Sequence, residues 1–357
     1  MRLLKQCFKP AQRGHIGLDI GSGAVKLVAL RPGTTGWSAT GAAWADIAPF
    51  DPEDKAGQYA HTLDALRDCI KQTSAISVRH VVCGLAGPDV VVRGFSFPMM
   101  PQSQIEKAVH FEAQQVCPMD MRSSVLDYQL LESATGEGQT PKKLSGVLVV
   151  GVEQTISERC RLVKEAGAKT ALIDADGLAA LNCLSALDDL DRYHTAALID
   201  IGRHSTHIIL LGADGLPFVR DLNMGVQTII EQICQTLKSD PDTVRDRLWG
   251  ASKKPIPDDM LMAFHHAARG LVMSINETLK YYASREKGQS VQKVYLCGGG
   301  AQISLLVELL CDALPTETAV FDPFETIHVD AGIPGADLLN TRGPAFTAAT
   351  GLAMRTI

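Results

Sequence analysis

Leu18-Asp19-Ile20-Gly21-Ser22-Gly23-Ala24-Val25-Lys26 is the first of two stretches that decide the fold of this chain. The second, Ile199-Asp200-Ile201-Gly202-Arg203-His204-Ser205-Thr206, has the same order of hydrophobic strand, Asp-Ile-Gly, polar turn and second strand. Strand-like apolar residues flank both turns, at 16–20, 25–30, 196–201 and 206–211. Each stretch therefore predicts a β-hairpin, and the pair indicates an internal duplication at the scale of a domain.

The two turns have the composition of phosphate-binding loops. In each, a strand delivers a carboxylate, Asp19 or Asp200, and the glycines let backbone N–H groups turn toward an anion. Two such loops facing each other would hold a polyphosphate from both sides. Asp19 and Asp200 would share a hydrated Mg²⁺, which usually keeps several waters. The other candidate contacts are Gly21, Ser22, Gly23, Ala24, Lys26, Gly202, Arg203, His204 and Ser205.

A single Asp-Ile-Gly turn would be an ordinary strand end, whereas two copies between hydrophobic strands favour phosphate binding. Neither G-x-G-x-x-G nor G-x-x-x-x-G-K-[ST] occurs, so the Rossmann and P-loop folds are not indicated. A third turn, Cys297-Gly298-Gly299-Gly300, follows a strand and precedes a helix. Such a turn lets a planar base or ribose approach the backbone, and the helix N-terminus after it favours anions.

The order of phosphate loop one, connecting helix, phosphate loop two and late glycine turn resembles that of the actin-like ATPase superfamily. More narrowly, the chain is similar to the PilM family of type IV pilus assembly proteins, which is related to the cell-division protein FtsA. This resemblance spans nearly the whole chain. It rests on further stretches, namely 97–106, Glu112-Ala113, Cys117-Pro118, Leu126-Asp127-Tyr128, 218–225 and 344–355.

The resemblance implies an α/β chain with the actin/Hsp70/ribonuclease-H-like two-lobed ATPase fold and an FtsA-like inserted subdomain. The implied parts are core subdomain 1A (1–78, 166–193 and 343–357), insert 1C (79–165), core subdomain 2A (194–224 and 290–342) and helical subdomain 2B (225–289). ATP and Mg²⁺ are expected in the cleft between the lobes. The chain is expected to be a peripheral protein at the cytoplasmic face of the inner membrane. There it is expected to bind the N-terminal tail of a PilN-like inner-membrane protein. That tail would lie in a groove between core and insert, with other pilus assembly proteins as further partners.

Two positions depart from the family pattern. Ala24 stands where loop one often has Ser or Thr, which removes a hydroxyl donor. Arg203-His204 makes loop two unusually basic, and this pair either strengthens phosphate contact or is a solvated turn. For hydrolysis, Asp176 matches the position at which relatives place an acid that orients water, but Asp174 and Asp176 fit helix capping equally well. We therefore expect nucleotide binding and at most a slow ATPase.

Composition excludes several other classes of protein. With a net charge of −6 and a pI near 5.9, the chain has no overall attraction to nucleic acid. Its nine cysteines include no C-x-x-C pair, which argues against a zinc site, and Cys183 and Cys297 lie within apolar runs typical of a core. No stretch has the roughly 20 apolar residues of a spanning helix.

Residues 1–10 are consistent with a disordered tail or a weak interfacial helix. The adjacent His265 and His266 are consistent with a surface pair.

Local patterns also predict a helix at 101–116 that begins with a Ser103/Glu106 capping box, and mainly helical structure at 226–286. Two other functions remain open. One is a sugar or small-acid kinase of the same fold, which a phosphorylated small molecule would reveal. The other is an FtsA-like filament-forming ATPase, which nucleotide-dependent pelleting would reveal.

Overall fold

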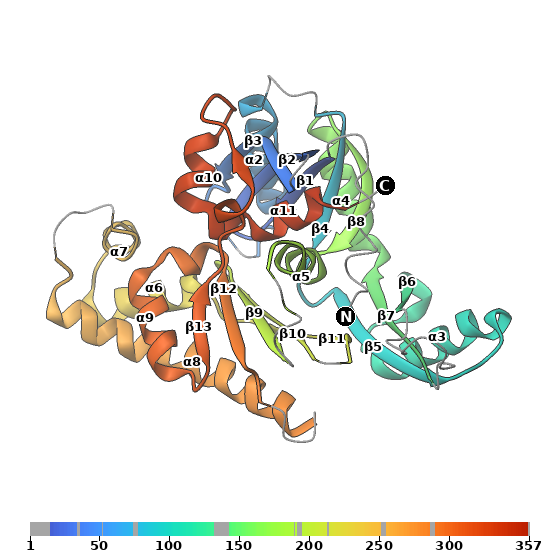
Figure 1. Ribbon diagram of the computed structural model, residues 1–357. Coiled ribbons are helices and arrows are strands. Elements are labelled where there is room, and N and C mark those ends of the chain that lie inside the picture. Colours follow the sequence, from blue (N-terminus) through green and yellow to red (C-terminus); the bar gives the residue numbers. More distant parts are fainter. Residues whose placement is uncertain are drawn as a thin grey trace.

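The computed structural model describes residues 15–33, 36–51, 53–73, 78–131, 143–188, 190, 195–212, 214–250, 255–285 and 290–355. The tail or interfacial helix predicted at 1–10 lies outside them. Figure 1 shows two lobes with a helix between them and a smaller subdomain projecting to one side. None of the helices in the described ranges, the 28-residue α8 (Asp258–Arg285) included, has the apolar length that crossing a membrane requires.

The first lobe is built on a six-stranded sheet. Its strand order is β14 (His328–Val329), β3 (Gly36–Asp46), β2 (Ala24–Gly33), β1 (His15–Ile20), β4 (His80–Leu85) and β8 (Lys169–Ala175). One face packs on α2 (Lys55–Gln72) and α4 (Glu153–Glu165), the other on α5 (Asp176–Leu187) and α11 (Thr347–Ala353). Helix α10 (Ala336–Arg342) packs against β3.

The second lobe repeats the hairpin on a five-stranded sheet. Its order is β11 (Pro217–Leu222), β10 (Thr206–Leu211), β9 (Ala196–Ile201), β12 (Lys293–Cys297) and β13 (Glu317–Val320). The outer face packs on α6 (Val226–Leu237), α7 (Pro241–Leu248), α8 and α9 (Ser304–Ala313). The inner face shares a core with α5 and α11, so helices that follow first-lobe strands hold the lobes together.

Alternation along the hairpin strands sorts their side chains between the two faces. Leu18 and Ile20 lie in the core beneath α2 and α4, which turns Asp19 toward the other lobe. In the same way, Ile199 and Ile201 pack against the outer helices of the second lobe, which turns Asp200 toward the first. The period of two in the sequence therefore places both carboxylates between the lobes.

The insert is a three-stranded antiparallel sheet, ordered β5 (Val90–Pro98), β7 (Lys143–Val152) and β6 (Ser124–Leu131), that is covered by α3 (Gln102–Val116). It is narrower than the implied range 79–165. Strand β4 pairs in parallel with β1, and α4 packs on β8, so both belong to the first lobe. The chain also returns to the first lobe before 343, because β14 pairs with β3.

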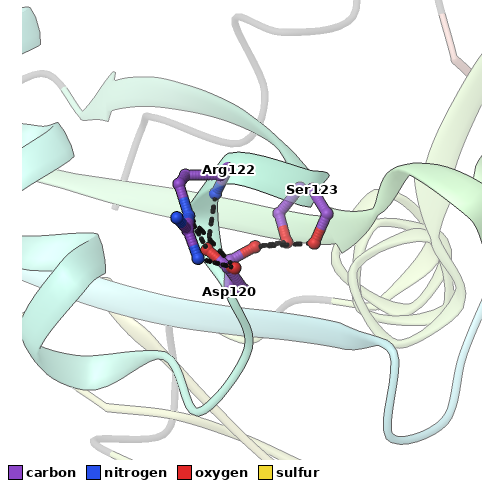
Figure 2. A network of polar contacts seen from close by, with 4 residues as sticks. Asp120, Arg122 and Ser123 are labelled. Atoms are coloured by element: carbon purple, nitrogen blue, oxygen red, sulfur yellow. Dashed lines mark hydrogen bonds and ion pairs between the residues drawn. The ribbon is translucent and has the colours of Figure 1, made fainter.

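The turn between α3 and β6 is organised by one aspartate. The Asp120 carboxylate accepts hydrogen bonds from the backbone N–H and the guanidinium of Arg122 (Figure 2). The backbone carbonyl of Asp120 accepts hydrogen bonds from the hydroxyls of Ser123 and Ser124. These contacts close the one-turn helix η1 (Met121–Ser123) and aim the chain into β6. They give the exposed end of the insert a fixed shape.

The predicted capping box is wrong. Helix α3 begins at Gln102 with Pro101 as its N-cap, and no side chain caps it. The backbone of Pro101 is extended, at φ −58° and ψ 142°, so the helix starts directly after it and Ser103 already lies inside the first turn. Other local predictions are confirmed: Cys183 and Cys297 are buried, and His265 and His266 are exposed.

Candidate functional site

In each hairpin, an aspartate on the first strand lies opposite a basic residue on the second strand, at equivalent positions. Asp19 on β1 lies opposite Lys26 on β2, and Asp200 on β9 lies opposite His207 on β10. Each aspartate is therefore seven residues before a basic residue that faces it across an antiparallel pair. The internal duplication extends to the charged side chains that lie between the lobes.

In the first lobe the pair forms an ion pair. Lys26 Nζ donates to Asp19 Oδ2 at 2.7 Å, and both side chains are largely buried. Burial alone would lower the pKa of Lys26, but Asp19 and the more distant Asp200 and Asp176 raise it above its usual value. Lys26 therefore stays charged and neutralises part of the carboxylate cluster.

In the second lobe His207 has two partners. Its Nδ1 lies 2.7 Å from Asp221 Oδ1 on β11, and its Nε2 lies 3.2 Å from the Ser205 hydroxyl of loop two. Burial would lower the pKa of His207, but the hydrogen bond to Asp221 and the charges of Asp200 and Asp176 raise it to about 9. The imidazole is thus a cation at neutral pH, and the pKa of Asp200 is raised by burial despite that neighbour.

The two predicted phosphate loops have the same backbone turn. Gly21 N–H donates to Ala24 O at 3.1 Å, and Gly202 N–H donates to Ser205 O at 2.9 Å. Among the described residues, the amides at positions 22, 23, 203 and 204 have no acceptor. Each loop therefore presents two successive backbone donors beyond its glycine, the arrangement that anion-binding nests use. The Ala24 methyl is buried, so it takes no part.

Loop one and loop two touch across the cleft. A Cβ atom added to Gly23 would lie 2.6 Å from Arg203 Cδ, so the arginine side chain covers that glycine. Arg203 Nε donates to Gln227 Oε1 of α6 at 3.3 Å. His204 is exposed, whereas Arg203 is half-buried against Gly23 and Gln227.

Asp176 lies at the first turn of α5 and does not cap it. The N-cap is Ala175, no side chain caps the helix, and Asp176 Oδ1 is buried without a hydrogen-bond partner. Burial, followed by the charge of Asp19, raises the pKa of Asp176. Asp174 instead forms an ion pair with Arg355 at 2.8 Å. The capping interpretation of these two residues is wrong.

The late glycine turn packs directly on loop two. Gly298 has φ +84°, and a Cβ there would lie 2.1 Å from Asp200 Oδ1, so only glycine fits. Its N–H donates to Pro344 O at 2.9 Å. The expected helix does not follow at once: a 3-10 turn, η3 (Gly299–Gln302), intervenes, and Gly300 packs against Ile201. A Cβ at Gly299 would meet nothing within 4 Å, so this glycine faces open space.

The donor set suits a hydrated cation better than a directly bound one. Among the described residues, no group of three or more His, Cys, Asp or Glu side chains is arranged to hold a metal ion. Mg²⁺ commonly takes one or two carboxylates and fills its other positions with water and phosphate. Asp19 and Asp200, close enough for one charge to raise the pKa of the other, fit that requirement.

Two residues of the site escaped the sequence analysis. His207 carried a detectable signal, since it follows Asp200 by the spacing that separates Lys26 from Asp19. Arg159 of α4 carried none. Its guanidinium donates to Ile20 O at 3.0 Å and lowers the pKa of Asp176 against the effect of burial, a position that depends on the packing of α4 alone.

A pocket of about 550 Å³ lies where the insert meets both lobes. Its walls come from the end of β4 and the loop after it, from β5, from the start of α5 and from β10 and β11. Apolar residues such as Val90, Val92 and Phe218 line it beside Arg93 and His207. Strands β5 and β11 are both edges of their sheets, so their outer backbone groups border this space.

The chain matches the family model of the type IV pilus assembly protein PilM over residues 17–357. A solved PilM-PilN type IV pilus biogenesis complex is similar in fold, with a TM-score of 0.76, 24% identity and coverage of 97% of this chain and 99% of that one. The ethanolamine utilization protein EutJ from Carboxydothermus hydrogenoformans has a TM-score of 0.56 at 12% identity, covering 99% and 94%. A glycerol dehydratase reactivase has 0.52 at 10% identity, covering 95% and 99%.

These matches confirm the predicted two-lobed actin-like fold, and they favour a pilus protein over the kinase and filament alternatives. The family model extends from loop one to the last residue of the chain. The chain belongs to the PilM family of type IV pilus assembly proteins.

Proposed function

We propose that this protein is an ATP-binding scaffold of type IV pilus assembly. The observation that carries the proposal is the paired hairpin geometry, which brings Asp19, Asp200 and two sets of backbone donors to one cleft. ATP phosphates would lie between the two loops, with Mg²⁺ held through water by the two carboxylates. The base or ribose would lie against the open Gly299. The bound cation would offset phosphate charge that these carboxylates otherwise repel.

Asp176 is the residue that we propose orients an attacking water. Its Oδ1 is buried without a partner, and its raised pKa favours acceptance of a proton. Lys26 and Arg159 supply compensating positive charge. We propose slow turnover at most, because the raised pKa leaves Asp176 largely protonated at neutral pH, and the protonated carboxyl cannot accept a proton from the attacking water.

The pocket at the insert is the proposed docking site for the cytoplasmic N-terminal tail of a PilN-like inner-membrane protein. An extended tail could add to an edge strand while alternate side chains enter apolar subsites. This docking would hold the protein at the cytoplasmic face of the inner membrane as a peripheral protein. The division into core, insert and helical subdomains then has a functional meaning: the cleft binds nucleotide and the insert joint binds the partner.

Calorimetric titration with Mg-ATP tests the nucleotide site. Asp19→Ala should lose binding by at least about tenfold, because it removes a carboxylate from the cation site. Asp312→Ala, an exposed change on α9, is the matched control and should bind like the wild type. Equal affinity in all three proteins would refute the assignment of the cleft.

Titration with a synthetic peptide copy of the N-terminal tail of a PilN-like protein tests the pocket. Val90→Asp places a charge in the apolar wall and should weaken peptide binding about tenfold or more. Val125→Asp, on the exposed side of β6, is the matched control and should bind normally. A point variant is preferable to deletion of 79–165, which would also remove β4 and α4 from the first lobe. Unchanged binding by Val90→Asp would exclude this pocket.

A further inference from the structure

His207 belongs to both proposed sites at once. Its Nε2 contacts Ser205, whose carbonyl closes loop two, and its Nδ1 contacts Asp221 in the pocket wall. The imidazole itself lines the pocket. One largely buried ring therefore contacts both the second proposed phosphate loop and the wall of the docking pocket.

The strand on the pocket side is held by one ladder and by contacts from the insert. Among the described strands, β11 is the edge of its sheet and pairs with β10 alone, so a shift of β11 disturbs one ladder. Asp221 lies directly opposite His207 in that ladder. From the insert side, Arg93 Nη1 reaches Val219 O of the same strand at 3.4 Å. Contacts from the insert and from loop two thus converge on β11.

Resting on the proposed function, we propose that His207 couples the two sites, so that nucleotide in the cleft and peptide in the pocket change each other's affinity through the Ser205–His207–Asp221 chain. A phosphate drawn into loop two moves Ser205, and the imidazole follows because its hydrogen-bond geometry is directional. Asp221 and the end of β11 then shift at the pocket wall. His207 is a positioning residue in this chain and contacts neither the reacting phosphate nor the cation.

Thermodynamic linkage makes the coupling measurable from either side. If Mg-ATP changes the peptide Kd by some factor, the peptide must change the Mg-ATP Kd by the same factor. We expect a factor of about fivefold or more, the lower end of common couplings. Loss of the relay should bring this factor toward one while each ligand still binds alone.

The experiment measures peptide Kd with and without a saturating, non-hydrolysable ATP analogue and Mg²⁺. His207→Gln removes the two-sided ring, and Asp221→Asn weakens the relay from its exposed end. His265→Gln, on the exposed face of α8, is the matched control. Hydrogen exchange of β11 amides on addition of the analogue gives a second readout that needs no peptide.

Support for the coupling is a fivefold or larger effect in wild type and His265→Gln that falls below about twofold in His207→Gln and Asp221→Asn. The analogue should also alter β11 exchange only in the proteins that keep the relay. An equal coupling factor in all four proteins overturns the inference, as does β11 exchange that never responds. A peptide that binds none of them, while the analogue does, refutes the docking proposal instead, and β11 exchange then still decides the relay.

Discussion

Replacement of Asp176 with alanine should make the ligand-free protein more stable. The carboxylate has a buried Oδ1 without a partner, and leaving such an acceptor unsatisfied costs about 1–3 kcal/mol, more when it is charged. Against this, the change loses an acidic residue from the first turn of α5, which contributes roughly 0.3–1 kcal/mol. Attraction to Arg159 and His207 is lost as well, but the raised pKa shows that burial and Asp19 outweigh it. The net gain should be about 1–2 kcal/mol at pH 8.

The gain should depend on pH in a defined direction. Because the pKa of Asp176 is higher in the folded state than its ordinary 3.8, the folded protein keeps a proton that the unfolded chain has released. Wild-type stability therefore falls as the pH rises above about 4 toward the folded pKa, and the alanine variant lacks this loss. The stability difference should be small near pH 4 and largest near pH 8.

Urea unfolding in EDTA at pH 5 and pH 8 measures both effects. Asp312→Ala, exposed on α9, should change the free energy of unfolding by no more than about 0.5 kcal/mol at either pH. If Asp176→Ala is less stable than wild type at pH 8, the basic neighbours hold the carboxylate favourably. The free-energy cost assigned to its burial is then refuted. A stabilised variant that hydrolyses ATP more slowly would show that stability was given up for function.

Three further variants test the same cleft. Lys26→Met should destabilise the protein by about 3–5 kcal/mol because it leaves Asp19 buried and unpaired, and adding Asp19→Asn should recover most of that loss in a double-mutant cycle. Gly298→Ala should cost about 1–3 kcal/mol and weaken ATP binding, since its positive φ and the contact with Asp200 leave no room for a methyl group; unaltered melting and affinity would contradict this. In wild type, the pKa of His207 is raised from 6.5 to about 9, so its stabilisation is fully present below pH 6.5 and is lost as the pH rises through 9. His207→Gln should lack that decline, of the order of 3 kcal/mol, and parallel pH profiles of the two proteins would disprove the shift.

The sequence was sufficient where structure is decided locally. Strands β9 and β10 begin and end at the residues predicted from their apolar patterns, because turn residues and alternation act over a few positions. The same alternation settled which way Asp19 and Asp200 point. The cleft could therefore be predicted before any tertiary contact was known.

Long-range pairing set the limits of that prediction. Strand β4 reads as part of the insert along the chain, yet it pairs with β1, more than 60 residues earlier. The residues 328–329 similarly return to β3. The position of Arg159 depends on how α4 packs, and no local pattern reports that. The cap predicted at Ser103 was wrong for a different reason: the helix begins directly after Pro101, which is its N-cap.

The contact between insert and second lobe has a mechanical consequence. The insert is covalently part of the first lobe, but Arg93 and Gly94 of β5 touch Val219 and Leu216 in and beside β11 of the second. A Cβ at Gly94 would lie 3.0 Å from that of Leu216, so a small outward shift of either strand would reach the roughly 3.5–4.5 Å that a disulfide spans. The insert therefore forms a second contact between the lobes, away from the nucleotide site. A hinge rotation that separates the lobes would have to break this contact. A single crosslink between β5 and β11 would thus fix the angle between the lobes.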